Sequence, residues 1–186
     1  MNLKQQILKV IIENKEKEFT IRGLSKKLKK DYKNTYDAVQ NLIGSLNINK
    51  KGNATYITYA PKLTNQIYEA EQARRDAVIK KIKILYRDIQ TASNPFFAAI
   101  LFGSFAKGNE TKNSDIDICI IHDNEDEIKP TLSRLRILPR IQLHPFHYSE
   151  FVQLLKNKDF NVGHEIVKDG IILRNIELFY EVIRHG

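Results

Sequence analysis

Hydrophobic residues in the first sixty positions recur first at a helical spacing and then at a strand-like spacing. Leu3, Ile7 and Val10 mark one face of an amphipathic segment. Thr20 and Asp31 are residue types that cap helix starts, so each predicts that a helix follows it. The pattern predicts helices over 2–14, 21–28 and 31 to about 46, with Tyr36 on the buried face of the third. It also predicts a hairpin with strands over 48–50 and 55–59.

The pattern in the rest of the chain predicts a long helix followed by alternating strands and helices. Residues 64–92 contain no Pro or Gly and predict one helix, whose second half has an apolar face and whose first half is polar. That polar half leaves a spacer and a contact between two copies of the chain as open alternatives. Later strands are predicted at 97–102, 115–121 and 141–146. Later helices are predicted at 149–155, capped by Ser149, and after residue 173 at the end of the chain.

Composition places the chain among globular cytoplasmic proteins. It has 186 residues, of which 42% are hydrophobic, enough for a packed core. Its single cysteine, Cys119, excludes a disulfide framework and a cysteine-based zinc module, which fits a reducing cytoplasm. The longest apolar run, residues 96–102, is far shorter than the ~20 residues of a membrane span, so no membrane association is expected. The expected fold class is α+β (α/β).

Positive charge is concentrated in the first third of the chain. Residues 1–62 hold 13 Lys and Arg against 5 Asp and Glu, whereas residues 63–186 hold 17 of each. Because the whole excess lies in one segment, it indicates a module that binds a polyanion such as nucleic acid.

The order helix, helix, tight turn, helix, hairpin resembles the winged helix-turn-helix family over about 60 residues. In that family the third helix enters the major groove of DNA. The resemblance implies base contacts from Lys33, Asn34 and Asp37, and double-stranded DNA as a partner. The implied phosphate contacts are Lys26, Lys29, Lys30, Lys50 and Lys51. Winged helices also serve as protein-docking modules, and this alternative stays open.

Candidate chemistry lies between residues 97 and 121. An apolar strand ends in Gly103-Ser104, where a glycine lets the backbone approach a phosphate and a serine adds a hydroxyl donor. Ten residues later, Asp115 and Asp117 alternate on a second predicted strand, so both carboxylates face one side about 7 Å apart. Paired carboxylates indicate a divalent cation, Mg²⁺ or Mn²⁺. Lys107 either adds charge to the phosphate site or is a surface lysine.

A strand ending in Gly-Ser, ten residues and Asp-x-Asp on the next strand resemble the nucleotidyltransferase superfamily of DNA polymerase β. Within it, the pattern is most similar to minimal nucleotidyltransferases related to kanamycin nucleotidyltransferase, over roughly residues 95–184. The resemblance implies transfer of a nucleoside monophosphate from an NTP, for which ATP is expected, to an acceptor. It implies catalytic roles for Asp115, Asp117 and Ser104, nucleotide binding by Gly103, Ser104 and Lys107, and two metal ions on Asp115 and Asp117.

The sequence departs from this family in one respect. Active members place a third carboxylate on the next strand, and the segment 140–147 contains no Asp or Glu. Gln142 or His144 would stand in its place, and Glu150 in the following helix is a further substitute. The acidic run 123–127 is interpreted as a solvated helix start instead of a site.

Two functions follow from these features. The first is a metal-dependent nucleotidyltransferase coupled to DNA binding, with an acceptor such as a protein hydroxyl, a small molecule or a nucleic-acid end. Some minimal nucleotidyltransferases are antitoxins that transfer AMP to a HEPN-type toxin, and such a partner is compatible with the motif. The alternative is a DNA-binding regulator whose transferase domain only senses a nucleotide. The expected organisation is a winged helix-turn-helix at 1–62, a linker helix at 63–94 and a nucleotidyltransferase domain at 95–186, with homodimerisation an open expectation.

Overall fold

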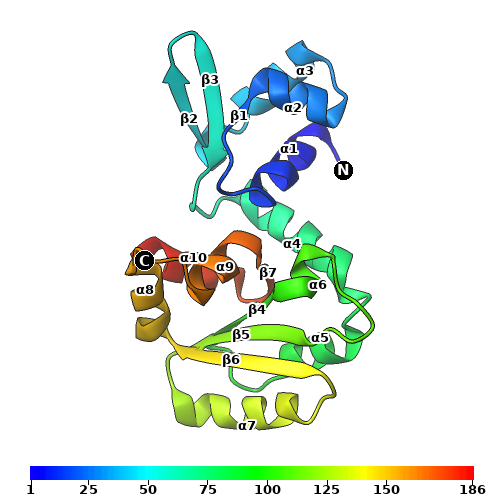
Figure 1. The fold of residues 1–186 in the computed structure, drawn as a ribbon, viewed down its shortest axis with the longest axis vertical. Coiled ribbons are helices and arrows are strands. Elements are labelled where there is room, and N and C mark those ends of the chain that lie inside the picture. The colour runs from blue at the N-terminus through cyan, green and yellow to red at the C-terminus, as the bar shows by residue number, and fades with distance from the viewer. The chain divides into compact units, whose positions relative to one another are not determined.

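The computed structural model describes all 186 residues, which form two compact units, Met1–Ala70 and Glu71–Gly186. Helices and strands of both units are labelled in Figure 1. The mixture of helices with two small sheets confirms the expected α+β class. None of the ten α-helices has the length and hydrophobicity that crossing a membrane requires.

The first unit combines three helices with a three-stranded antiparallel sheet of order β1-β3-β2. Each helix start is capped as the sequence predicts. The side chain of Thr20 accepts the backbone N–H of Gly23 (3.0 Å), and that of Asp31 accepts the N–H of Asn34 (3.0 Å). Its elements are α1 (Leu3–Ile12), β1 (Phe19–Thr20), α2 (Ile21–Leu28), α3 (Tyr32–Gln40), β2 (Leu46–Lys51), β3 (Ala54–Tyr59) and a 3₁₀ turn (Ile43–Ser45).

The third helix is shorter than its sequence pattern predicts. It ends at Gln40, because a 3₁₀ turn containing Gly44 intervenes before Leu46 opens strand β2. The buried face of α3 carries Ala38 and Val39, while Tyr36, which the helical pattern places in the core, is 43% exposed. The prediction for Tyr36 is therefore wrong, and the ring is available at the surface.

The expected single helix over 64–92 is two helices. These are α4 (Asn65–Ile79) and α5 (Lys83–Gln90), with a short break at 80–82. The boundary between the two units falls within α4, between Ala70 and Glu71. Hydrophobic spacing continued across the break, so only the structure reveals it.

The second unit has a four-stranded mixed sheet of order β6-β5-β4-β7. Strand β4 pairs antiparallel with β5 and β7, and β5 pairs parallel with β6. Its remaining elements are β4 (Phe97–Phe102), α6 (Gly103–Lys107), β5 (Ile116–His122), α7 (Glu125–Arg136), β6 (Ile141–His147), α8 (Tyr148–Lys156), α9 (Val162–Asp169), β7 (Ile171–Arg174) and α10 (Ile176–His185).

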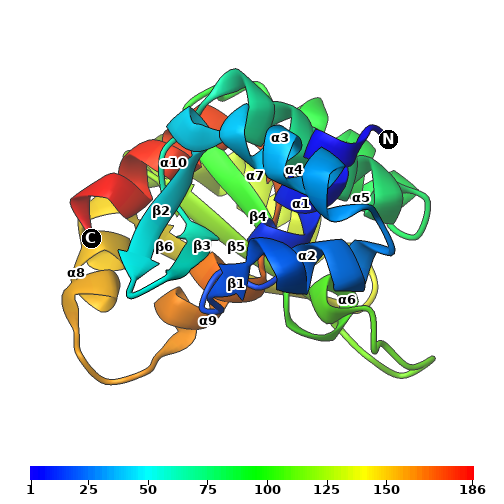
Figure 2. The same ribbon diagram turned by 90° about the horizontal axis from the view of Figure 1, so that it is seen from above.

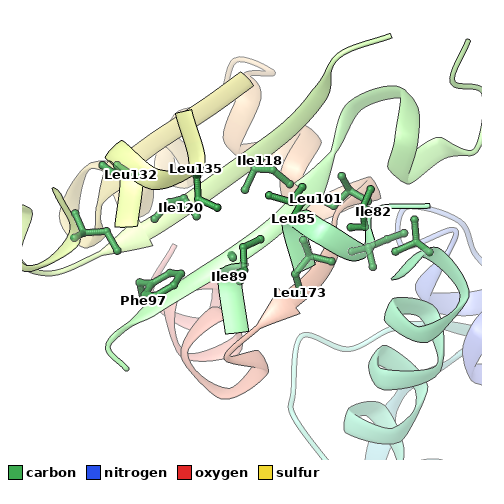
Figure 3. Packing of buried hydrophobic residues seen from close by; sticks show 14 residues of the cluster. Ile82, Leu85, Ile89, Phe97, Leu101, Ile118, Ile120, Leu132, Leu135 and Leu173 are labelled. Atoms are coloured by element: carbon green, nitrogen blue, oxygen red, sulfur yellow. The ribbon is translucent and has the colours of Figure 1, made fainter. Parts of the chain in front are cut away.

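Helices cover both faces of this sheet, with α7 on one side and α9 and α10 on the other (Figure 1); Figure 2 gives the view from above. On one face, Leu101 of β4 and Ile118 of β5 pack against Leu85 of α5 and Leu135 of α7 in a dry core (Figure 3). Burial of such side chains supplies most of the driving force for folding, about 1.5–3 kcal/mol each. The opposite face, covered by α8, α9 and α10, carries the polar residues described below.

The polar half of the 64–92 segment is partly internal. Glu71 is completely buried and Arg74 is 8% exposed. Arg74 donates to Glu71 (2.8 Å), and the hydroxyl of Tyr180 in α10 donates to the other carboxylate oxygen (2.9 Å). These contacts anchor the second part of α4 within the second unit, so a purely solvated spacer is ruled out for these residues.

Candidate active site

Gly103 and Asp117 come together where β4 ends beside the start of β5. The antiparallel register places Phe102 opposite Asp117, and Gly103 follows directly. Gly103 has φ +66°, in the left-handed region that glycine tolerates best. A Cβ atom at Gly103 would lie 2.2 Å from Oδ2 of Asp117, so only glycine fits against this carboxylate. The turn and the carboxylate predicted to share a site are therefore in contact.

Asp115 precedes β5 and Asp117 lies within it. Asp115 is exposed, whereas the Asp117 side chain retains 23% exposure. Burial raises the pKa of the Asp117 carboxyl above its ordinary value. The negative charge of Asp115 raises this pKa further, while His144 lowers it. A partly buried carboxylate with a second negative charge nearby favours a bound cation or a proton.

Ser104 and Lys107 lie in α6, the short helix that begins at Gly103. Ser104 is half-buried beside the glycine turn. The Lys107 ammonium is 2.6 Å from Oε1 of Glu165 and 3.7 Å from Oδ2 of Asp169, both in α9. The hydrogen bond to Glu165 raises the pKa of Lys107. The ammonium group of this predicted phosphate-binding lysine is thus paired with two carboxylates.

Strand β6 has Gln142, and no carboxylate, at the position beside Asp117. The parallel register pairs Gln142 with Asp117 and His144 with Cys119. Nε2 of His144 lies 3.8 Å from Oδ1 of Asp117, beyond hydrogen-bond distance, and is buried without a hydrogen-bond partner. Its ring also stacks edge-on against Phe102 at 5.0 Å. Gln142 and His144 were the two residues predicted to replace the third carboxylate, and His144 is the one with a ring nitrogen near Asp117 that has no hydrogen-bond partner.

Glu165 is a residue of this region that the sequence pattern does not reveal. It lies in the first turn of α9, and its charge raises the pKa of Asp117, so it is close enough to interact with that carboxylate. No local motif marks Glu165, because α9 lies more than forty residues beyond Asp117 and was not among the predicted elements. Its position depends on how α9 packs against β4 and α6.

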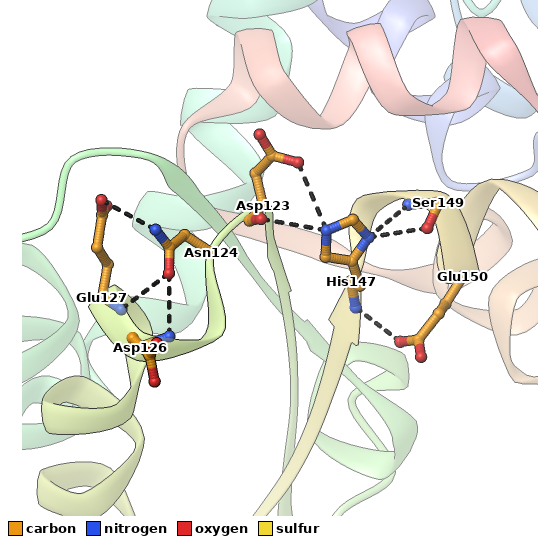
Figure 4. Close-up of polar contacts among 7 residues, drawn as sticks. All are labelled: Asp123, Asn124, Asp126, Glu127, His147, Ser149 and Glu150. Atoms are coloured by element: carbon orange, nitrogen blue, oxygen red, sulfur yellow. Dashed lines mark hydrogen bonds and ion pairs between the residues drawn. The ribbon is translucent and has the colours of Figure 1, made fainter.

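Glu150 lies at the opposite end of β6 and does not replace the missing carboxylate. It accepts the backbone N–H of His147 (2.8 Å) as a cap of α8 (Figure 4). The β6 residue paired with Asp117 is Gln142. His147 lies five residues further along the strand, about 16 Å from Gln142. The cap residue of α8 is also His147, where Ser149 was expected.

The acidic run 123–127 is the solvated helix start that the sequence indicates. Asn124 caps α7 by accepting the N–H groups of Asp126 (3.0 Å) and Glu127 (3.3 Å), as Figure 4 shows. The acidic side chains in this first turn stabilise the helix electrostatically. Cys119 is fully buried, and burial raises the pKa of its thiol well above the ordinary value, so it is a core side chain.

The donor set beside Gly103 fits a cation that arrives with a nucleotide. No group of three His, Cys, Asp or Glu side chains is arranged to hold a metal ion by itself. Mg²⁺ in phosphate-transfer sites typically takes one or two carboxylates and completes its coordination with water and substrate phosphates. Asp115 and Asp117 supply that number, and carboxylate oxygens are ligands that both Mg²⁺ and Mn²⁺ accept.

The residues predicted to contact DNA are all exposed in the first unit. Lys33 and Asp37 are one turn apart on α3, while Lys51 at the end of β2 forms an ion pair with Glu18 (2.8 Å). That pair offsets part of the charge predicted for the hairpin. The other predicted residues are Lys26, Lys29, Lys30, Asn34 and Lys50.

Comparisons with known proteins identify the second unit more closely. Residues 87–177 match the family described as polymerase beta, nucleotidyltransferase, and this range contains Gly103, Ser104, Asp115 and Asp117. Among curated proteins, none matches the sequence. A chain in a crystal structure of a toxin-antitoxin with AMP-PNP is 20% identical, with a TM-score of 0.35, covering 56% of this chain and 78% of that one. Residues 87–177 are therefore similar to a nucleotidyltransferase domain.

Proposed function

We propose that the second unit transfers a nucleoside monophosphate from an NTP, with ATP as the expected donor, to an acceptor hydroxyl. The observation that supports this proposal is the close approach of Gly103 to Asp117, because it brings the turn predicted to bind phosphate next to a carboxylate predicted to bind metal. The acceptor class that we propose is a protein hydroxyl, as in antitoxins that modify a HEPN-type partner.

Each side chain has a role that follows from its position. The Gly103 turn and the Ser104 hydroxyl bind the triphosphate, and Asp115 with Asp117 hold Mg²⁺ or Mn²⁺. When bound, the cation neutralises phosphate charge and activates the acceptor hydroxyl. Nε2 of His144, unpartnered and near Asp117, is placed to orient that hydroxyl or receive its proton.

Lys107 would change partners when the nucleotide binds. Its ion pairs with Glu165 and Asp169 hold it in the helix that follows the glycine turn. A triphosphate carries more negative charge than either carboxylate, so it competes for the ammonium group. Release of Glu165 would then add a free carboxylate to the region around Asp117.

The proposal is tested by comparing ATP labelled at the α- and the γ-phosphate. Nucleotidyl transfer moves only the α label to an acceptor, or releases labelled AMP when water is the acceptor. We expect Mn²⁺-dependent release from the wild type and at least a hundredfold loss in Asp115→Asn and Asp117→Asn. The matched control is Asp126→Asn, at an aspartate that is 90% exposed in α7. Release of γ-labelled phosphate alone would contradict the proposal.

We further propose that the first unit is a winged helix-turn-helix that binds double-stranded DNA. Supporting this are the order of its elements, the basic composition of residues 1–62 and the exposure of every residue predicted to touch DNA. Lys50→Ala with Lys51→Ala should weaken binding on all duplexes and flatten its salt dependence, whereas Lys33 or Asn34 variants should change sequence preference. Salt-insensitive binding would contradict this proposal.

One observation favours a second candidate function, a DNA-binding regulator that senses a nucleotide without turning it over. Strand β6 has Gln142 opposite Asp117, so the usual third carboxylate is missing from its strand position. Such a regulator would bind Mn²⁺ and ATP through Asp117 but release no AMP. Equilibrium binding of Mn²⁺–ATP, measured beside the α-label assay on the same protein, distinguishes the two functions.

A further inference from the structure

The first unit contains a groove that neither the motif at Gly103 nor the predicted base-contacting residues explain. Its volume is about 720 Å³, within the range of small-molecule sites, roughly 300–1,000 Å³. Its lining comes from helices α2 and α3 and from the end of the β2–β3 hairpin. It includes Arg22, Lys26, Tyr32, Tyr36, Asn53 and Thr55.

Two tyrosine rings stand exposed along one side of the groove. Tyr32 is 53% exposed and Tyr36 is 43% exposed, and their spacing of four residues places them on the same side of α3. Lysine ammonium groups lie over two other tyrosines of this unit, Tyr56 and Tyr59, but over neither of these rings. Exposed aromatic faces of this kind are the platforms on which unpaired bases stack in proteins that bind single-stranded nucleic acids.

The other side of the groove is basic. Arg22 and Lys26, one turn apart on α2, are both exposed and line the groove together. No carboxylate is among the lining residues. The hydroxyl of Ser25 donates to the carbonyl of Arg22 (3.0 Å), whereas Asn53 and Thr55 present polar side chains from the hairpin. The groove is thus lined by positive charge, aromatic rings and hydrogen-bonding groups.

We propose that this groove binds an unpaired nucleotide of a single-stranded nucleic acid. Its base stacks on Tyr32 or Tyr36, and its phosphates bind Arg22 and Lys26. Asn53 and Thr55 are positioned to hydrogen-bond a base edge. The inference does not rest on nucleotidyl transfer.

The groove shares Lys26 with the phosphate contacts predicted for duplex DNA, but its tyrosines are not among the residues predicted to contact bases. Successive residues of an α-helix are rotated by about 100°, so Lys33 and Asp37 lie on a different side of α3 from Tyr32 and Tyr36. A paired base within a duplex keeps its faces covered by its neighbours. Only an unpaired base can offer a face to an exposed ring, which is why the tyrosines indicate single strands.

The test uses the full chain and three fluorescein-labelled probes: twelve-residue oligo(dT), twelve-residue oligo(rU) and a mixed-sequence twelve-base-pair duplex. Anisotropy titrations should show binding to at least one single strand. Tyr32→Ala with Tyr36→Ala should weaken it at least about tenfold, while the matching Phe variants keep it, because stacking needs the ring and not the hydroxyl. The DNA and RNA arms show which sugar the groove prefers.

The basic side has its own readout. Arg22→Ala with Lys26→Ala should reduce the slope of log affinity against log salt for the single strand by about 1.4, at about 0.7 per phosphate contact. The matched control, Lys4→Ala with Lys9→Ala, removes two exposed positive charges from α1, outside the groove lining, and should leave single-strand affinity within about twofold.

A spectroscopic measurement keeps the test decisive if an alanine variant folds poorly. An oligonucleotide containing 2-aminopurine should change its fluorescence on stacking against wild type and against the Phe variants. Absence of single-strand binding by the wild type would overturn the inference. So would equal affinity of the alanine and Phe variants with unchanged far-UV circular dichroism, or tyrosine-insensitive binding to duplex alone.

Discussion

Replacing Gly103 by alanine would show directly whether the Asp117 carboxylate rests against the glycine turn. Two costs apply. A residue other than glycine in the left-handed region loses about 1–2 kcal/mol. The added Cβ would also lie 2.2 Å from Oδ2 of Asp117, and relieving that overlap by moving the carboxylate costs roughly 1–3 kcal/mol more. We therefore expect Gly103→Ala to lower the free energy of unfolding by about 2–5 kcal/mol.

Gly108 provides the matched control for this variant. It has φ +70°, almost the same as Gly103, but a Cβ there meets nothing within 4 Å. Gly108→Ala should therefore lose only the backbone cost, about 1–2 kcal/mol. Urea unfolding followed by far-UV circular dichroism measures both, and only the transition of the second unit should move. The difference between the variants isolates the contact with Asp117.

A double-mutant cycle completes the test. In an Asp117→Ala background the nearest remaining atom, the Cβ at position 117, lies 3.4 Å from the new Cβ, an ordinary van der Waals contact. The extra cost of Gly103→Ala should then disappear, giving a coupling energy of roughly 1–3 kcal/mol. Gly103→Ala should also lose Mn²⁺–ATP binding that Gly108→Ala keeps. Equal destabilisation by both glycine variants, or no coupling, would refute the reasoning.

Three further outcomes follow from buried charges. Asp117→Asn should raise the melting temperature by roughly 1–3 °C at neutral pH, because the raised pKa of Asp117 makes its ionised form unfavourable in the fold. This gain should disappear at low pH, where the aspartate is protonated. Calorimetry measures both effects, with Asp126→Asn as the control. Arg74→Met should lower the free energy of unfolding in urea by about 3–5 kcal/mol, because it leaves Glu71 buried and unpaired. Adding Glu71→Gln should recover most of that loss. Independent effects of the two substitutions would contradict the pairing. Burial lowers the pKa of His122, so the unfolded chain binds a proton at a higher pH than the folded chain does. The free energy of unfolding should therefore fall as the pH drops below about 6.5, and His122→Gln should reduce this fall. A His122→Gln variant that melts like the wild type at every pH would contradict this prediction.

Local sequence patterns predicted the elements that their own residues specify. Thr20 and Asp31 begin helices in the structure because each side chain accepts a nearby backbone N–H, a contact within four residues. The acidic run after His122 likewise forms a capped helix start. Predictions failed where packing competes with local preference. Tyr36 is exposed, and the predicted long helix breaks at 80–82, although the hydrophobic spacing continued through both places.

The sequence by itself determined the chemistry of the candidate site: a glycine and a serine after a buried strand, and two aspartates that alternate on the next. Tertiary structure alone decided what surrounds them. Strand β6 pairs beside β5 in a register that brings His144 to Asp117, and α9 docks so that Glu165 holds Lys107. These partners are separated by tens of residues along the chain. Their meeting depends on strand order and helix packing, which depend on burial of the whole core and are not encoded by any one segment.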